Sequence, residues 1–517
     1  MSVALPVFLD HASTTPIDPR AAAAMAECLA GPEGLGNPSS ATHAYGRAAA
    51  ARIERARAEV AALVGASPVD IVFTSGATES DNLALIGIAR GRASFGRHLV
   101  VPRTEHKAVL DPARHLEKAG WTVSWLEPAA DGRITPEAVA AALRPDTQLV
   151  SVMHANNETG VVNDIAAIAA VCRARDVLVH TDAAQSAGKL PIDLAALGVD
   201  LLSLSAHKMY GPKGVGALVV TPRARPWVEP LLWGGPQERG LRAGTPATHQ
   251  IAGFGVAAAL AAERLAADAV HTGALAARLR AALADLPGLR FNDHPSARLP
   301  GLLSVSIEGV EGESLIDALP QIAVSSGAAC DSASGEPSYV LRALGLPPEL
   351  ARSTLRIAFG RFNTAADADL AAAAIRGAVT KLRDEDASGA PVAAPGDASW
   401  VAGEAGRLRD GTRVRCYLRV AQPHPGTGPG QGTGEPLCIA AAEFRVYGCP
   451  HTRAVAASLA PALVGQPLQA PSDAAVGGPQ GWAARHGVPP EKLGRLLLVE
   501  DAWLRAREAA LAAAHRP

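Results

Sequence analysis

The first candidate for chemistry is a lysine that follows an apolar run. Residues 199–204 read Val-Asp-Leu-Leu-Ser-Leu, and Ser205-Ala206-His207-Lys208 comes directly after them. This pattern predicts a buried strand with a lysine at its end, where desolvation lowers the pKa of the amine. Such an amine can form an aldimine with the aldehyde of pyridoxal 5′-phosphate (PLP). For this motif alone, a surface lysine after a core strand is the alternative.

Two polar residues some twenty positions earlier fit the same cofactor. Asp182 ends the preceding predicted strand, and Gln185 follows three residues later. A carboxylate at that place can pair with the pyridinium nitrogen and keep the ring an electron sink. Gln185 is expected to reach the phenolic oxygen of the ring.

A phosphate cradle is predicted where residues 70–74 run into Ser75-Gly76-Ala77-Thr78-Glu79-Ser80. A strand, a glycine turn and a helix N-terminus together present backbone N–H groups and a favourable dipole to an anion. Ala77 and Thr78 are the expected phosphate contacts. An ordinary helix cap is the alternative reading of these residues.

Two more segments place polar side chains where strands end, which is where open α/β sheets bind ligands. His106 follows the apolar run 98–102, and Asn157 follows the run 149–153. We expect His106 to stack on the pyridine face and Asn157 to hydrogen-bond a ring substituent. Taken singly, each would more often be a loop side chain with ordinary partners.

The order of these motifs resembles the cysteine desulfurases of iron–sulfur cluster assembly, which are fold-type I PLP enzymes of the class V aminotransferase group. The resemblance spans about residues 5–383 and is carried by eight segments: 9–15, 36–40, 75–80, 104–106, 156–158, 182–185, 205–208 and 242–245. It implies that Lys208 carries the cofactor and that Thr78, Ser205 and His207 bind its phosphate. It also implies that Thr245 reaches the cofactor of a neighbouring subunit, and therefore a homodimer.

A nucleophile would separate a desulfurase from its transaminating relatives. Cys330 lies in the run 324–338, which is rich in Ser, Gly and Ala and is expected to be a mobile loop rather than core. A mobile thiol can attack the sulfur of bound cysteine and carry the persulfide to an acceptor. A thiol is only a few per cent ionised at neutral pH, and His106 is a candidate for moving its proton. A buried, inert cysteine is the alternative.

Recognition of the substrate carboxylate calls for an arginine, because the planar guanidinium donates to both carboxylate oxygens at once. Arg356 lies on the alternating run 353–361 and fills this role by resemblance. Asn37 and Asn157 are expected to share the carboxylate contact. An arginine on an exposed edge strand is the alternative.

The composition indicates a cytoplasmic enzyme. The net charge of −2 and the pI near 6.7 give no general attraction to nucleic acid or to anionic membranes. Six cysteines without Cys-x-x-Cys pairs predict neither a disulfide framework nor a metal site. We find no signal-peptide pattern and no apolar run long enough to span a bilayer. Cys28 and Cys172 are expected in the core.

The chain divides into four predicted regions. Strands alternate with Ala-rich helices over 17–262, which predicts a large α/β domain with a mostly parallel sheet covered on both faces. Residues 1–16 and 263–383, with a last helix over 365–383, form a smaller α+β domain. Residues 384–399 lose periodicity and are expected to be a linker.

Residues 400–517 form a further α+β domain, with strands expected at 413–420 and 437–447, a loop at 422–436, and a helix opened by Gly448-Cys449-Pro450. The segments 443–449, 454–459, 488–493 and 500–502 resemble the iron–sulfur scaffold family. Only Cys449 matches that family's cysteine ligands, since Arg495 replaces another. One thiolate cannot hold a cluster. Cys449 is therefore expected to accept sulfur from Cys330, or the domain is a structural remnant or a docking and regulatory module.

The sequence predicts a cysteine desulfurase that converts L-cysteine to L-alanine and leaves a persulfide on Cys330 for an iron–sulfur scaffold or another acceptor protein. Another class V PLP enzyme, such as an aminotransferase or a selenocysteine lyase, is the alternative. The acceptor is not identified by the sequence.

Overall fold

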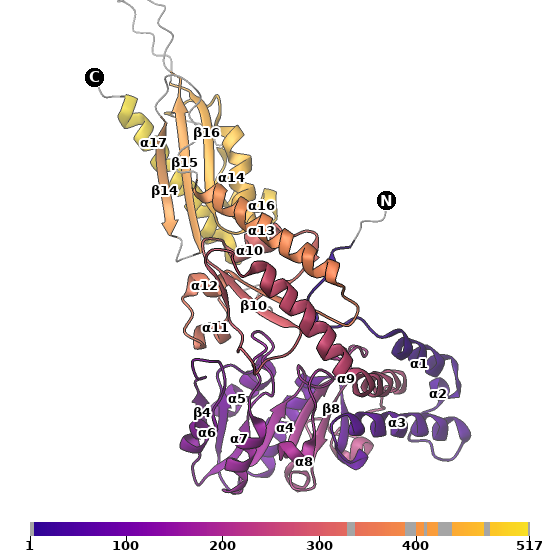
Figure 1. Cartoon of the computed structure of the whole chain (residues 1–517). Helices are drawn as coiled ribbons and strands as arrows, with labels where there is room; N and C mark the ends of the chain where they lie inside the picture. The colour runs from indigo at the N-terminus through magenta and orange to yellow at the C-terminus, as the bar shows by residue number, and fades with distance from the viewer. Residues whose placement is uncertain are drawn as a thin grey trace, which may run out of the picture.

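The computed structural model describes residues 5–327, 337–387, 400–407, 411–421, 437–469 and 476–514. Figure 1 shows three parts in a row: a broad lower part built from the first half of the chain, a middle part, and a narrow upper part that ends the chain. Among the described residues, none of the helices is both long and apolar enough to cross a bilayer.

The lower part is built on a seven-stranded sheet with the order β2-β8-β7-β6-β5-β3-β4, in which only β8 runs opposite to the others. This confirms the predicted mostly parallel sheet. Its strands are β2 (Ile71–Thr74), β3 (His98–Pro102), β4 (Thr122–Leu126), β5 (Thr147–Ser151), β6 (Leu178–Asp182), β7 (Leu201–Ser205) and β8 (Gly216–Val220).

Helices cover both faces of this sheet because its strands are apolar on both sides. Val100 packs into one core with α3, α7 and α9, while its neighbours Leu99 and Val101 pack into another with α4 and α5. The helices of this part are α1 (Pro19–Ala30), α2 (Pro32–Leu35), α3 (Ala44–Leu63), α4 (Ala77–Gly91), α5 (Lys107–Lys118), α6 (Pro136–Ala142), α7 (Ile165–Arg173), α8 (Leu194–Leu197) and the first half of α9 (Thr248–Leu283).

The middle part combines the N-terminal segment with residues after α9. Strand β1 (Val7–Phe8) pairs with β11 (Ile322–Ala323), so the chain start belongs here. An antiparallel sheet has the order β12-β13-β10-β9. Its strands are β9 (Leu289–Phe291), β10 (Leu302–Ile307), β12 (Ser325–Ser326) and β13 (Thr354–Ala358), and its helices are α10 (Gly312–Asp317), α11 (Tyr339–Ala343), α12 (Pro348–Arg352) and α13 (Ala365–Ala387).

Two boundaries differ from the sequence expectation. Helix α9 runs unbroken through position 262, so one helix joins the lower and middle parts (Figure 1). Helix α13 continues to Ala387, four residues past the expected end at 383, because nothing in Asp384-Glu385-Asp386 breaks a helix. The rest of the predicted linker, residues 388–399, lies outside the described residues.

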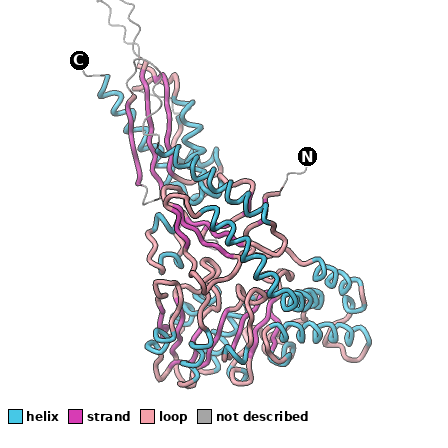
Figure 2. Tube along the Cα trace, viewed as in Figure 1, coloured by secondary structure: helices cyan, strands magenta, loops and turns pink. Residues whose placement is uncertain are grey.

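The upper part is a three-stranded antiparallel sheet. Figure 2 shows helices lying alongside its strands. This part contains β14 (Val401–Arg407), β15 (Thr412–Val420), β16 (Ile439–Tyr447), α14 (Pro450–Leu463), α16 (Pro479–His486) and α17 (Leu493–Ala514). Val414, Cys416 and Leu418 alternate along β15 and face the helices. The predicted strands and the helix after Cys449 are present, and the predicted loop 422–436 lies outside the described residues.

The upper part packs on the middle part through α10. The Tyr447 hydroxyl donates to the Val310 carbonyl at 3.0 Å, and the Ser314 hydroxyl donates to the Gly448 carbonyl. Lys492 Nζ lies 2.6 Å from a Glu313 carboxylate oxygen. The C-terminal domain is therefore docked by side chains as well as joined by the chain.

Candidate active site

A cavity of about 1230 Å³ opens where the parallel strands of the large sheet end. Loops after β2, β3, β5, β6 and β7 converge there, together with β13 and the N-terminal segment of the small domain. Its lining includes most of the predicted site residues: Ala77, Thr78, His106, Asn157, Asp182, Gln185, Ser205, His207, Lys208 and Arg356. The topology thus brings together predicted site residues up to 279 positions apart, from Ala77 to Arg356.

Lys208 sits at the end of the short helical turn η2 (Ala206–Lys208) that follows β7. Its Nζ donates to the carbonyls of Ala12 and Ser13, at 2.6 and 2.7 Å. These two carbonyls hold the amine of Lys208, which lines the cavity. The prediction that Lys208 ends a buried strand is confirmed.

Asp182 ends β6, where its carboxylate accepts from the Ala184 backbone N–H at 2.8 Å. Burial raises the pKa of Asp182 to about 6, and the neighbouring carboxylate of Asp81 adds to the rise. A cationic ring nitrogen beside it would offset that desolvation and keep the carboxylate ionised. The sequence did not single out Asp81, although it lies one helical turn after Ala77 on α4 and lines the same cavity.

The strand, glycine turn and helix start that the sequence predicts after residue 70 are present. Ala77 opens α4 after Gly76, whose φ of +154° an L-residue rarely adopts. Gly216 must also be a glycine, because a Cβ there would lie 2.6 Å from Gly76 Cα. His207 on the facing loop contacts Thr14 Oγ1 through Nδ1 at 3.1 Å, and burial lowers its pKa to about 4. A neutral imidazole can offer Nε2–H to an anion.

His106 and Asn157 approach the cavity from the loops after β3 and β5. His106 caps α5, and its Nδ1 accepts from the Ala108 N–H at 3.1 Å. This hydrogen bond fixes the orientation of the imidazole ring relative to the helix. Burial lowers the pKa of His106, while Asp182 raises it. Asn157 Oδ1 is buried without a hydrogen-bond partner among the described residues, so it offers an acceptor to a bound molecule.

Arg356 reaches the cavity from the centre of β13 and is 2% exposed, so the edge-strand alternative is wrong. Its guanidinium donates to Asp10, to the Ser13 hydroxyl and to the Asn157 carbonyl at 2.8, 2.6 and 3.0 Å. Among the residues that the structure describes, its Nε has no hydrogen-bond partner. A buried arginine with spare donor capacity is suited to a carboxylate ligand.

Among the described residues, three that the sequence singled out do not line this cavity within one chain. Thr245 is exposed on the segment before α9, and Asn37 is exposed between α2 and α3 with its side chain accepting from Ser39. Cys449 is fully buried beside α10, with Sγ 3.3 Å from Thr452 Oγ1. Cys330 lies outside the described residues. Cys28 and Cys172 are buried in α1 and α7, as expected.

The donor set fits PLP. The cavity is lined by a lysine amine, a carboxylate, a helix N-terminus with hydroxyls and two imidazoles, which suit the aldehyde, ring nitrogen, phosphate and ring of that cofactor. The unpaired Asn157 Oδ1 and the glycine cradle at Gly76 are local features that a bound cofactor would explain.

Comparison with known proteins identifies the class. The model of the aminotransferase class-V family matches residues 7–370. A solved NifS-like protein, 34% identical, superposes with a TM-score of 0.68 and covers 73% of this chain and 100% of its own. The chain belongs to the aminotransferase class-V family.

Within that family its relatives are desulfurases. The cysteine desulfurase IscS of Pseudomonas entomophila (strain L48) is 53% identical over 380 residues, covering 74% of this chain and 94% of its own. The cysteine desulfurase IscS of Azotobacter vinelandii is 54% identical over 380 residues, which again cover 74% of this chain and 94% of its own. The chain is a PLP-dependent cysteine desulfurase. The family match ends before the C-terminal domain begins.

Proposed function

We propose that this desulfurase binds L-cysteine between Arg356 and Lys208, carries the released sulfur on Cys330, and passes it to an acceptor protein of iron–sulfur cluster assembly. The convergence of Lys208, Asp182 and Arg356 on one cavity supports this assignment. Bound PLP supplies an electron sink for charge that develops at the substrate Cα.

The side chains of the chain would divide the remaining work. Arg356 holds the substrate carboxylate, and the Lys208 amine, which the Ala12 and Ser13 carbonyls orient, moves the Cα proton. The Cys330 sulfur attacks the substrate sulfur, whose bond to Cβ breaks with its electron pair left on carbon. A proton on that carbon completes alanine. L-Cysteine and the Cys330 thiol thus give L-alanine and a Cys330 persulfide.

Two variants test these roles. Cys330→Ala should release no sulfide from cysteine yet keep the visible absorption of the cofactor. Lys208→Ala should lose both. Sulfide release by the Cys330→Ala protein at the wild-type rate would refute the nucleophile, and formation of a keto acid in place of alanine would favour transamination.

The acceptor and the assembly are part of the same proposal. Thr245 is exposed in one chain, and a homodimer would let it reach the cofactor of a second subunit. A persulfide carrier works best where thiols stay reduced, which agrees with the cytoplasm. Pull-down with a scaffold protein and sedimentation at micromolar concentration test the two partners.

For the C-terminal domain, docking against α10 favours a docking or regulatory role over a sulfur relay. Cys449 is 0% exposed and lies at the contact with α10, so a persulfide could reach it only after the domains separate. Within the described ranges, three or more His, Cys, Asp or Glu side chains nowhere gather to hold a metal ion. Mass spectrometry after incubation with cysteine tests the relay: a persulfide on Cys449 would favour it.

A further inference from the structure

A second lysine stands behind the first. Lys189 lies in the loop after β6, and its Nζ donates to Gln185 Oε1 at 3.1 Å. The other end of that amide, Gln185 Nε2, donates to the Ala12 carbonyl at 2.8 Å. Lys208 Nζ donates to the same carbonyl at 2.6 Å. Both lysines are thus linked through one amide and one carbonyl.

These contacts determine which way the Gln185 amide faces. The two ends of an amide have nearly the same shape, so only hydrogen-bond partners choose between its two orientations. An ammonium can only donate, and it therefore holds Oε1 on its own side. Nε2 is then kept on the side of Ala12 and the cofactor cavity, where Gln185 is expected to contact the phenolic oxygen.

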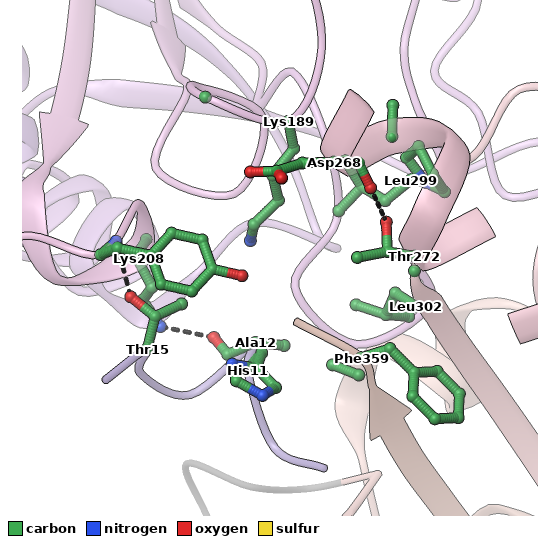
Figure 3. Close-up of a pocket in the computed structure, with 16 residues that line it drawn as sticks. His11, Ala12, Thr15, Lys189, Lys208, Asp268, Thr272, Leu299, Leu302 and Phe359 are labelled. Atoms are coloured by element: carbon green, nitrogen blue, oxygen red, sulfur yellow. Dashed lines mark hydrogen bonds between the residues drawn. The ribbon is translucent and has the colours of Figure 1, made fainter. Parts of the chain in front are cut away.

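Lys189 lines a second, smaller pocket that shares Ala12 and Lys208 with the cofactor cavity. Figure 3 shows Lys189 extending into this pocket, with Asp268 beside it and His11 across from it. The ionisable and charged groups that face Lys189 or act on it are His11 in the N-terminal segment, His207, Lys208 and Tyr210 after β7, Asp268 on α9 and Arg356 on β13.

The charge on Lys189 is sensitive to these surroundings. Burial lowers the pKa of Lys189 to about 7, with Lys208 and Arg356 adding to the fall. Asp268 does not neutralise it, because that carboxylate is held by Arg361 and Arg264. An ordinary surface lysine, by contrast, is solvated by water, and its charge has little effect on neighbouring groups.

We propose that Lys189 is a positioning residue of the desulfurase, which fixes the Gln185 amide with Nε2 toward the cofactor and so favours the unprotonated form of the cofactor-bearing Lys208 nitrogen. This inference rests on the proposed roles of Lys208 and Gln185. A hydrogen bond from Gln185 Nε2 to the phenolic oxygen disfavours a proton on the Lys208 nitrogen. The nearby positive charge of Lys189 disfavours that proton as well. Loss of Lys189 removes the cation and frees the amide to turn.

The test is a pH titration of the visible absorption of the PLP-loaded enzyme. Lys189→Met, of similar length but without charge or donors, should raise the midpoint by roughly one pH unit and lower kcat more than it raises KM. Lys189→Arg keeps a cationic donor and should stay near wild type. If Lys189→Met does not fold, Lys189→Gln replaces it with the same expected direction.

A double-mutant cycle shows whether Lys189 acts through Gln185. Gln185→Ala should raise the midpoint by itself, and adding Lys189→Met should then shift it by clearly less than in the wild-type background. An unchanged midpoint in Lys189→Met, or a full additive shift in the double variant, would overturn the inference. Wild-type protein that shows neither cofactor absorption nor alanine formation would instead refute the proposed function.

Discussion

At the scale of single residues, the most exacting requirement falls on Arg356. The Asp10, Ser13 and Asn157 contacts hold its guanidinium in one plane, and a lysine could not reproduce that fork. Arg356→Lys should lower kcat/KM for cysteine by roughly ten- to a hundredfold, corresponding to about 1.5–3 kcal/mol for a hydrogen bond to a charged group. Steady-state alanine formation measures this change. The exposed Arg278→Lys, paired with Asp369 on α13, is the matched control and should leave kcat/KM unchanged.

Asp81 gives a second prediction at this scale. Its carboxylate is fully buried, and burial raises its pKa from 3.8 to about 7. Because the folded pKa is the higher one, ionisation penalises the folded state as the pH rises from about 4 to about 7. Asp81→Asn should therefore stabilise the protein by only about 1 kcal/mol at pH 4.5 and by up to roughly 4 kcal/mol at pH 8.

Melting temperatures of cofactor-free Asp81→Asn and wild type across that pH range measure the effect. Asp70→Asn is a useful comparison, since Asp70 is also buried but pairs with Arg225. It should destabilise the protein at neutral pH. A difference between Asp81→Asn and wild type that does not vary with pH would contradict the assignment to Asp81.

The sequence located residues whose role follows from their place after a strand, and it missed those whose role depends on a neighbour. Lys208, Asp182 and His106 each follow an apolar run and meet in the cavity. Asp81 and Lys189 matter because of buried surroundings that come from other elements. Helical spacing from Ala77 would have suggested Asp81, but no local pattern marks Lys189.

At the scale of elements, a buried ion pair ties the cofactor sheet to the segment before α9. Arg57 on α3 binds the Glu238 carboxylate through two nitrogens, at 2.7 and 2.8 Å, and the Phe73 N–H donates to the same group. Glu238 and Arg239 take left-handed φ angles of 45° and 58° to reach it. This turn lies a few residues before Thr245, so the ion pair determines the course of that segment.

Glu238→Ala should destabilise the protein by about 3–5 kcal/mol, because the buried guanidinium of Arg57 then loses its buried carboxylate partner. Glu54→Ala removes the exposed partner of the same arginine, 60% exposed, and should cost less than about 1 kcal/mol. Thermal and urea unfolding compare the two. Equal losses would mean that the burial of the Glu238 pair contributes nothing.

Element order followed from the sequence because apolar runs of four to six residues alternate with Ala-rich helical stretches. The pairing of β1 with β11, separated by more than 300 residues, gave no local signal. The reversed direction of β8 likewise depends on the short connection from Lys208 to Gly216, which leaves no room for a crossover helix.

At the scale of the whole molecule, the described contacts pack the C-terminal domain against the small domain. Helix α10 of the small domain presents Glu313 to Lys492 and Arg495, at 2.6 and 3.7 Å. The same helix presents Ser314 to Arg453 at 3.1 Å. Arg495 and Lys492 therefore contact the small domain through the same carboxylate.

Charge reversal at that helix tests the docking. Glu313→Lys should place three cations together and release the C-terminal domain, since like charges at a half-buried contact repel strongly. Hydrogen exchange should then rise in α10 and α14, while the large sheet keeps its protection.

Asp317→Lys makes the same charge change at an exposed position of the same helix and should leave hydrogen exchange unaltered. Adding Lys492→Glu to Glu313→Lys should restore much of the protection, because the pair is then re-formed with opposite signs. Unaltered exchange in Glu313→Lys would mean that Tyr447 and Ser314 hold the domain without the ion pair.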